Sequence, residues 1–275
     1  MKSLIKIEWL KIKKYPVFWW MIGIVSLTYP GVNLMFYGIY RTMTDTKDAM
    51  TNGIFKMLIG EPFAFPEAWH SIAYFSSAFV MVPAILVIML INNEYSYKTN
   101  RQNIIDGWSR KDFVLSKLID VAIIALAITL IYTVTTIGFA LVNDASSMSR
   151  FAEQLYYIPL FFLQTFSQLS LAFLAGFFIK KSFLAIGIFL IYYVIVENMI
   201  VSGFSYYNIF IYKYLPFELS DRMIPPAAFI GKFGPDGVTK YKATLNAIPL
   251  HVALTLIFTA GIWVLCFKNY KKRDL

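Results

Sequence analysis

Residues 121–143 read VAIIALAITLIYTVTTIGFALVN and contain no charged side chain. A helix needs about 20 consecutive apolar residues to cross the hydrocarbon core of a bilayer. The run is continuously apolar, whereas the strands of a membrane barrel alternate between apolar and polar residues. This stretch therefore predicts a membrane-spanning helix, and it sets the fold class for the rest of the chain.

Five further stretches have the same character, so we expect six spans in one transmembrane domain over residues 1–275. Lipid offers no partner for backbone polar groups, so apolar spans of this kind must be helical. The chain is 58% hydrophobic and 15% charged, against about 45–50% and about 25% in soluble domains. The fold class is therefore all-α integral membrane, with Pro83 expected to kink the second span. The predicted spans cover residues 17–39, 71–92, 118–142, 155–179, 183–202 and 247–267, and an external segment covers residues 203–246.

Lys and Arg residues are distributed unevenly between the loops. With the N-terminus inside, the inner segments carry 16 of the 25 Lys and Arg residues, although the outer loops are longer. Cytoplasmic loops are enriched in these residues, so both termini are predicted to be cytoplasmic. The apolar run from Tyr15 to Tyr40 is too long for a cleaved signal peptide and is expected to be retained. We attribute the net charge of +9 to the Lys and Arg residues that orient the spans in the membrane. We expect no nucleic-acid partner, because no basic-aromatic motif accompanies this charge.

Residues 2–14 carry a helical signal before the first span. Ile5, Trp9 and Ile12 recur at helical spacing, with Lys residues beside or opposite them. This pattern is typical of an amphipathic helix that lies in the membrane interface.

The loop after the second span also carries helical signals. Residues 94–106 predict a short helix, in which Glu94 and Lys98 have the favourable i,i+4 order. Gly107 stands where a left-handed residue would end this helix, and Ser109 with Asp112 fits the capping box of the next one. The spacing leaves open whether the short helix is a plain connector or docks on a partner.

This layout resembles the permease subunit of an ABC-2 type transporter over essentially the whole chain. The resemblance implies a type V exporter-like fold, in which helix 94–106 is the coupling helix that docks on an ABC ATP-binding subunit. It also implies that ATP and Mg are bound by that subunit, and that a second permease chain, identical or related, completes the transporter. Asn100, Gln102 and Asn103 depart from the more apolar family pattern. Besides the amphipathic helix, the residues that carry the resemblance, and the implied coupling role, are Glu94, Thr99, Arg101, Gly107, Ser109, Arg110 and Lys117.

Five side chains are candidates for a transport path. A carboxylate inside a span is costly and usually faces a bundle interior or an aqueous cavity; for Glu197, a local hydrogen bond near the outer end of span five is the alternative. The aromatic members suit a hydrophobic or amphipathic cargo such as a peptide, a lipid or a drug-like molecule. The candidates are Glu197, Phe75, Phe79, Phe189 and Tyr193.

The sequence offers no motif for catalysis. The P-loop pattern is absent from it, so we expect no nucleotide binding on this chain. His70 and His251 are the only histidines and lie at the edges of different spans, which argues against a metal or triad site. We therefore expect a non-enzymatic exporter subunit in the plasma (inner) membrane of a bacterium. The alternatives are a non-transporting membrane scaffold of a secretion or motility complex and, less favoured, an intramembrane enzyme.

Overall fold

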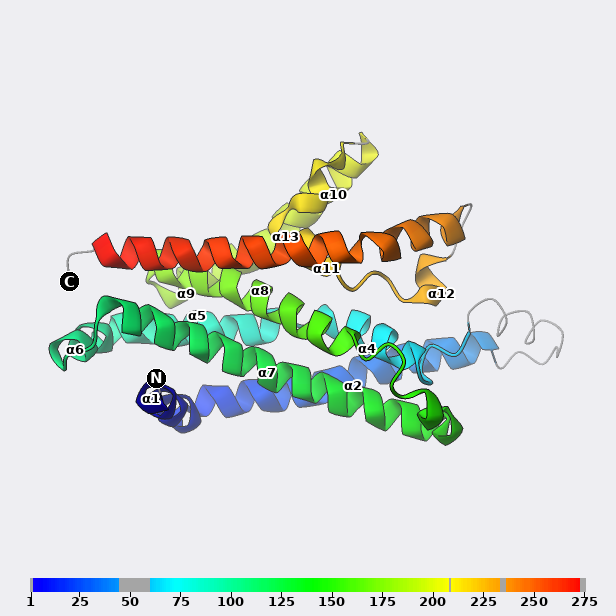
Figure 1. Ribbon diagram of the computed structural model, residues 1–275, viewed down its shortest axis with the longest axis horizontal. Helices are drawn as coiled ribbons and strands as arrows, with labels where there is room; N and C mark the ends of the chain where they lie inside the picture. The colour runs from blue at the N-terminus through cyan, green and yellow to red at the C-terminus, as the bar shows by residue number, and fades with distance from the viewer. Residues whose placement is uncertain (1, 45–59, 208, 233–235, 273–275) are drawn as a thin grey trace.

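The computed structural model describes residues 2–44, 60–207, 209–232 and 236–272, and these form an elongated bundle of helices (Figure 1). In these ranges there is no strand. Five helices are long and apolar enough to cross a membrane, and a bent pair of helices provides a sixth crossing. The predicted all-α membrane architecture is therefore confirmed.

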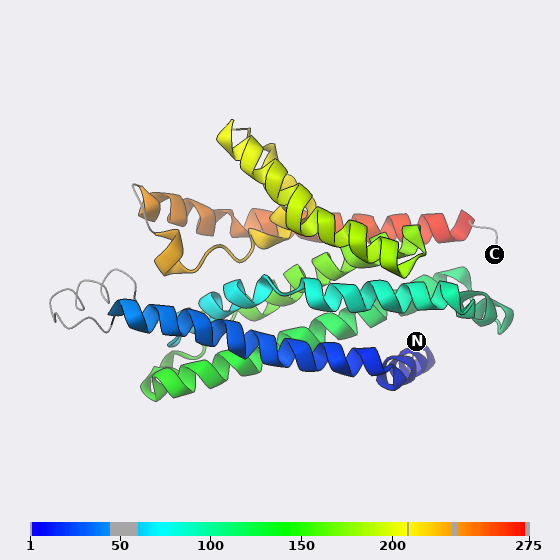
Figure 2. The ribbon, with the colours of Figure 1, turned by 180° about the vertical axis from the view of Figure 1, so that it is seen from behind.

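The apolar spans run along the bundle, and shorter helices lie between them. The N-terminus, the C-terminus and α6 lie at one end, here called the α6 end (Figures 1 and 2). The spans are α2 (Pro16–Thr44), α4 (Glu67–Ser77) with α5 (Met81–Ser96), α7 (Arg110–Asn143), α8 (Tyr157–Ile179), α9 (Ser182–Ile191) with α10 (Glu197–Tyr206), and α13 (Gly237–Lys272). The shorter helices are α1 (Lys2–Lys14), α6 (Thr99–Ile105), α11 (Pro216–Asp221) and α12 (Ala228–Gly231).

The second span is bent by 52° between α4 and α5. The sequence predicts a kink in this span at Pro83, and the break lies within the turn before it, at residues 78–80. Pro83 has no N–H to donate to the Phe79 carbonyl, four residues back, and its ring crowds that carbonyl. At the break, the N–H groups of Phe79 and Val80 donate to carbonyls three residues back. The predicted kink is therefore confirmed.

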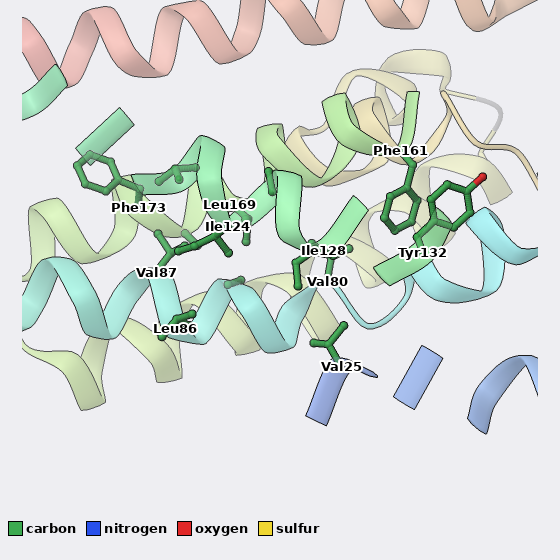
Figure 3. Close-up of a cluster of buried hydrophobic side chains, with 14 of the residues drawn as sticks. Val25, Val80, Leu86, Val87, Ile124, Ile128, Tyr132, Phe161, Leu169 and Phe173 are labelled. Carbon is green, nitrogen blue, oxygen red and sulfur yellow. The ribbon is translucent and has the colours of Figure 1, made fainter. Parts of the chain in front are cut away.

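The centre of the bundle is α8, which packs against α5, α7 and α13. Figure 3 shows buried side chains from these elements meeting in one cluster, including Val87, Ile128 and Leu169. Tyr132 of α7 stacks on Phe161 of α8 with the ring centroids 4.4 Å apart. These contacts hold α5, α7 and α8 together at the centre of the bundle.

The fifth span departs from the bundle. A π-helical turn over Tyr192–Val196 separates α9 from α10, and both views show α10 leaving the other helices at an angle (Figures 1 and 2). Most of this apolar helix faces outward, which suits contact with lipid or with another chain.

The predicted external segment over residues 203–246 overlaps two long helices of the structure. Its first residues belong to α10, and its last residues belong to α13, which begins at Gly237. Between them, α11 packs against α8 and α13 beside the middle of α13 (Figure 1). The sequence did not predict that α11 packs against α8 and α13, because the Pro residues around α11 indicate only a loop broken into short pieces.

Candidate functional site

Five charged side chains from α1, α5 and α7 meet near the α6 end, and they are called the ionic cluster here. At its centre, the Nζ atom of Lys117 donates to three carboxylates: Glu8 at 2.6 Å, Glu94 at 2.9 Å and Asp120 at 3.0 Å. Lys11 adds contacts of 3.0 Å to Glu8 and 3.3 Å to Glu94. The cluster thus ties the N-terminal helix to the second and third spans.

Most of the ionic cluster is buried. Lys117 is 4% exposed, Glu8 1% and Asp120 5%, whereas the side chain of Lys11 is 37% exposed. Buried ion pairs are costly to break, because removing one partner leaves an uncompensated charge away from water. The contact between α1 and α7 therefore depends on Lys117 more than on Lys11.

The predicted amphipathic stripe of α1 is divided in the structure. Ile12 is buried, whereas Trp9 is exposed and Glu8 lies on the buried face; the side chain of Ile5 lies outside the described residues. The periodicity of apolar residues could not reveal this, because Lys117 lies 109 positions further along the chain. The outward face of α1, with Ile7, Trp9 and Leu10 exposed, remains compatible with a membrane interface.

The electrostatics of Glu8 follow from these neighbours. Burial raises the pKa of Glu8, but the ammonium group of Lys117 and a hydrogen bond with Asp120 act in the opposite direction, and Lys11 adds to them. The net result lowers the pKa of Glu8 to about 2. Glu8 is therefore ionised at neutral pH.

A cavity of about 200 Å³ borders the ionic cluster. Its wall includes all five charged members, and the Oδ1 atom of Asp120 has no hydrogen-bond partner among the described residues. The uncharged part of the wall consists of Ile12, Tyr15, Leu90, Asn93, Tyr97 and Thr99.

The predicted coupling helix 94–106 is wrong as a single element. Glu94 belongs to the last turn of α5, and α6 begins only at Thr99, because Lys98 between them adopts a left-handed conformation with φ of 55°. The proposed Glu94–Lys98 pair is replaced by contacts of Glu94 with Lys117 and Lys11. The hydroxyl of Thr99 rejoins the two helices by donating to Glu94 Oε2 at 2.6 Å.

Two local predictions in this loop are confirmed. Gly107 has a φ of +96°, a conformation that favours glycine. Ser109 and Asp112 form the capping box at the start of α7, with the Asp112 N–H donating to the Ser109 side chain at 3.1 Å. Both depend on a few neighbouring residues, which is why the sequence could predict them.

The seven candidate coupling residues fall into two groups. Glu94 and Lys117 belong to the ionic cluster, and Thr99 donates a hydrogen bond to Glu94 beside it. The other four lie at the surface of the loop or beside it, where Arg110 donates to the Lys271 carbonyl at 2.7 Å and so joins α7 to the end of α13. This second group consists of Arg101, Gly107, Ser109 and Arg110.

The exposed side of the loop is both apolar and basic. Tyr97 and Ile105 are each 77% exposed, and Lys98 and Arg101 are exposed nearby. Large apolar side chains of this kind at the end of a membrane bundle are typical of a protein contact.

The candidate transport-path residues do not all come together. Glu197 is buried and accepts hydrogen bonds from the N–H groups of Phe217 at 2.8 Å and Glu218 at 2.7 Å. It therefore accepts from the first turn of α11, 20 positions away, and it also has the local side-chain contact considered from the sequence, with Tyr192. Phe189 and Tyr193 pack around the ring of Phe217, with centroid distances of 5.6 Å and 4.8 Å.

The two remaining candidates lie on α4 and just after it. Phe75 is buried and stacks on Phe36 of α2 with the centroids 3.8 Å apart, and Phe79 is partly buried at the bend of the second span. Phe75 thus contributes to the contact between α2 and α4.

A polar contact at the other end of α11 was not predicted from the sequence. The amide groups of Gln164 and Gln168 on α8 each donate to the Asp221 carboxylate at 2.7 Å. Both glutamines are buried. Their spacing of four residues on an apolar helix is the signal that could have indicated one shared partner.

A bundle of apolar spans, with a short exposed helix joined to a buried ionic cluster at one end, defines a multi-pass membrane protein of the permease type. Residues 4–196 match the model of the ABC-2 family transporter proteins, and the chain belongs to this family. No curated protein matches the chain. The protein is therefore the membrane-spanning subunit of an ABC transporter, a class whose members work with an ABC ATP-binding partner.

Proposed function

We propose that this chain is the permease of an ATP-driven exporter that moves a hydrophobic or amphipathic cargo, such as a peptide, a lipid or a drug-like molecule. ATP and Mg are bound by a separate subunit that docks at the α6 end. A second permease chain, identical or related, completes the transporter in the plasma (inner) membrane of a bacterium. Both termini face the cytoplasm, in keeping with the distribution of Lys and Arg residues.

The observation that carries this proposal is the position of α6. Its exposed surface offers Ile105 and Arg101 to a partner, with Tyr97 just before it. On its inner side, Thr99 is hydrogen-bonded to Glu94 of the ionic cluster. A displacement of α6 by a partner therefore reaches α1, α5 and α7 together, because Glu94 shares Lys117 with the other carboxylates.

An apolar groove between α2 and α7 supports a hydrophobic cargo. Its volume is about 580 Å³, which is within the range of sites that enclose small organic molecules. Thr135, one of its few polar members, turns its hydroxyl to the Ile131 carbonyl, so the lining offers little to a polar ligand. The groove is lined by Ser26, Pro30, Leu34, Leu130, Ile131, Val134, Thr135, Gly138, Phe139 and Val142.

Co-purification tests the proposed docking site. The tagged chain should bring down an ATPase, and Arg101→Glu combined with Ile105→Asp should release it. These substitutions are preferred to a change at Arg110, which also holds the end of α13. Lys240→Glu, an exposed charge reversal on α13, is the matched control and should leave the complex intact. Failure to recover any ATPase would refute the proposal.

The transport activity needs a separate measurement. In the recovered complex, ATP hydrolysis should rise when hydrophobic peptides or lipids are added. A complex that forms but never responds to any cargo would indicate a scaffold instead of an exporter.

A further inference from the structure

The ionic cluster contains more buried negative charge than positive charge. Glu8, Glu94 and Asp120 face only the ammonium groups of Lys11 and Lys117. A buried carboxylate without a compensating charge is strongly unfavourable, and such a group takes up a proton or a cation.

The other groups around the cluster do not correct this imbalance. Tyr15 lies between α1 and α2 and accepts a hydrogen bond from Asn93 of α5. Tyr97 follows α5, and Thr99 begins α6. Tyrosine, asparagine and threonine side chains supply no positive charge. Among the described residues that line the cavity, the excess of one carboxylate therefore stands.

Asp120 is the carboxyl group whose geometry leaves room for a proton. Its Oδ2 atom accepts from Lys117 at 3.0 Å, while its buried Oδ1 atom accepts no hydrogen bond from a donor among the described residues. Asp120 and Glu8 also lie within hydrogen-bonding reach of each other. Two carboxylates are acceptors only, so a hydrogen bond between them requires that one of them is protonated.

The proton belongs on Asp120 more than on Glu8. Burial raises the pKa of Glu8, but Lys117 and the hydrogen bond with Asp120 lower it to about 2. Glu8 also accepts from both lysines, whereas Asp120 accepts from Lys117 alone. Glu8 is therefore the acceptor, and Asp120 is the donor.

We propose that the ionic cluster is a proton-binding site, in which Asp120 carries the proton and donates it to Glu8, so that the docking of α1 on α7 depends on pH. The proton comes from water at the α6 end and returns to it through the adjacent cavity of about 200 Å³. When the proton leaves, Glu8 and Asp120 both carry a negative charge and repel each other, which loosens α1 from α7. This inference does not depend on the proposed ATP-binding partner.

Infrared difference spectroscopy of the full chain in lipid nanodiscs tests the proton directly. At neutral pH, the wild-type spectrum should contain the carbonyl band of a buried protonated carboxyl group, and Asp120→Asn should remove its contribution. Glu153→Gln, which changes an exposed carboxylate, should leave the band unchanged. An identical buried-carboxyl signal in the wild type and in Asp120→Asn would overturn the proposal.

Distance measurements test the effect on α1. Spin labels at Lys6→Cys and Lys111→Cys, both exposed positions, report the separation of α1 from the start of α7, and the native Cys266 is buried. In the wild type, the distance distribution should broaden reversibly as the pH is raised above neutral, because the second of two carboxyls that share a site ionises only at a raised pH. The broadening should be lost in Asp120→Asn, whose amide donates to Glu8 at every pH.

Two further measurements complete the test. Glu8→Gln also removes the shared proton, so it should flatten the pH dependence even if Asp120→Asn folds poorly. The distances should not change when Na⁺ replaces K⁺ or when either salt is raised at constant pH. A response to the salt cation instead of to pH would identify a metal-cation site and overturn the proposal.

Discussion

Lys117→Met should destabilise the protein far more than Lys11→Met, although both lysines contact Glu8 and Glu94. Methionine keeps most of the length of the lysine side chain and removes its charge. In Lys117→Met, three buried carboxylates lose the ammonium group that they share. In Lys11→Met, the same carboxylates keep Lys117, and the lost contact is partly open to water.

The expected difference follows from burial. Removing one partner of a buried ion pair costs about 3–5 kcal/mol, and Lys117 is 4% exposed. A solvent-exposed pair contributes about 0–1 kcal/mol, and the side chain of Lys11 is 37% exposed. At about 2–4 °C per kcal/mol for a protein of this size, Lys117→Met should lower Tm by roughly 6–20 °C. Lys11→Met should lower it by about 4 °C or less.

Thermal unfolding in detergent or nanodiscs, followed by intrinsic tryptophan fluorescence at neutral pH, measures both shifts. The double variant Lys117→Met with Glu94→Gln adds an internal check. Glu94→Gln removes one of the carboxylates that lose their buried ammonium partner in Lys117→Met, so the two changes should cost less together than the sum of their separate costs. Equal Tm shifts for Lys117→Met and Lys11→Met would refute the argument that burial decides the strength of these contacts.

Three further outcomes are expected. Gly176→Ala should destabilise the contact of α8 with α5 by about 1–3 kcal/mol, because its Cβ would lie 2.5 Å from Cγ2 of Ile91. Gly187→Ala, where no atom lies within 4 Å, should leave Tm nearly unchanged, and equal shifts would contradict the close packing. Glu197→Ala should speed limited proteolysis between α10 and α13, since two N–H groups of α11 lose their acceptor at about 1–3 kcal/mol each; Glu197→Gln keeps an acceptor and should do so much less. Since the pKa of Glu8 is lowered from 4.5 to about 2, its stabilising contribution is full above pH 4.5 and is lost as the pH falls towards 2. The stability gap between the wild type and Glu8→Gln should therefore shrink in acid, and a gap that is constant with pH would argue against this ion pair.

The features that the sequence predicted are those that depend on neighbouring residues. A charge-free run such as residues 121–143 predicts a span without knowledge of its neighbours, because the bilayer is the main determinant. The capping box of Ser109 and Asp112 and the left-handed Gly107 depend on residues within one turn. The left-handed conformation of Lys98, by contrast, carries no sequence signal, since non-glycine residues rarely adopt it.

The features that the sequence missed join distant parts of the chain. In the sequence, Glu8 is a lone acidic residue among lysines, and Asp120 is a single charge near the start of an apolar run. Lys117 can be recognised as their common partner only from the structure, in which α1 packs against α7. For the same reason, the apolar periodicity of residues 2–14 predicted a helix but could not predict which of its faces is buried, because a charged partner on α7 decides this.

The composition of the ionic cluster indicates that the contact between α1 and α7 can open. Burying charges is costly, and well-packed apolar side chains would hold α1 to α7 at least as firmly. An apolar contact, however, would not respond to the loss of a proton or to a displacement of Thr99 on α6. The ionic cluster should respond to both events, because Lys117 contacts carboxyl groups from α1, α5 and α7 at once. Withdrawing Glu8 or Glu94 leaves a buried ammonium group without one of its ionised partners. A push on α6 and a rise in pH should therefore weaken the same contact, and their effects on the distance between α1 and α7 should not be additive.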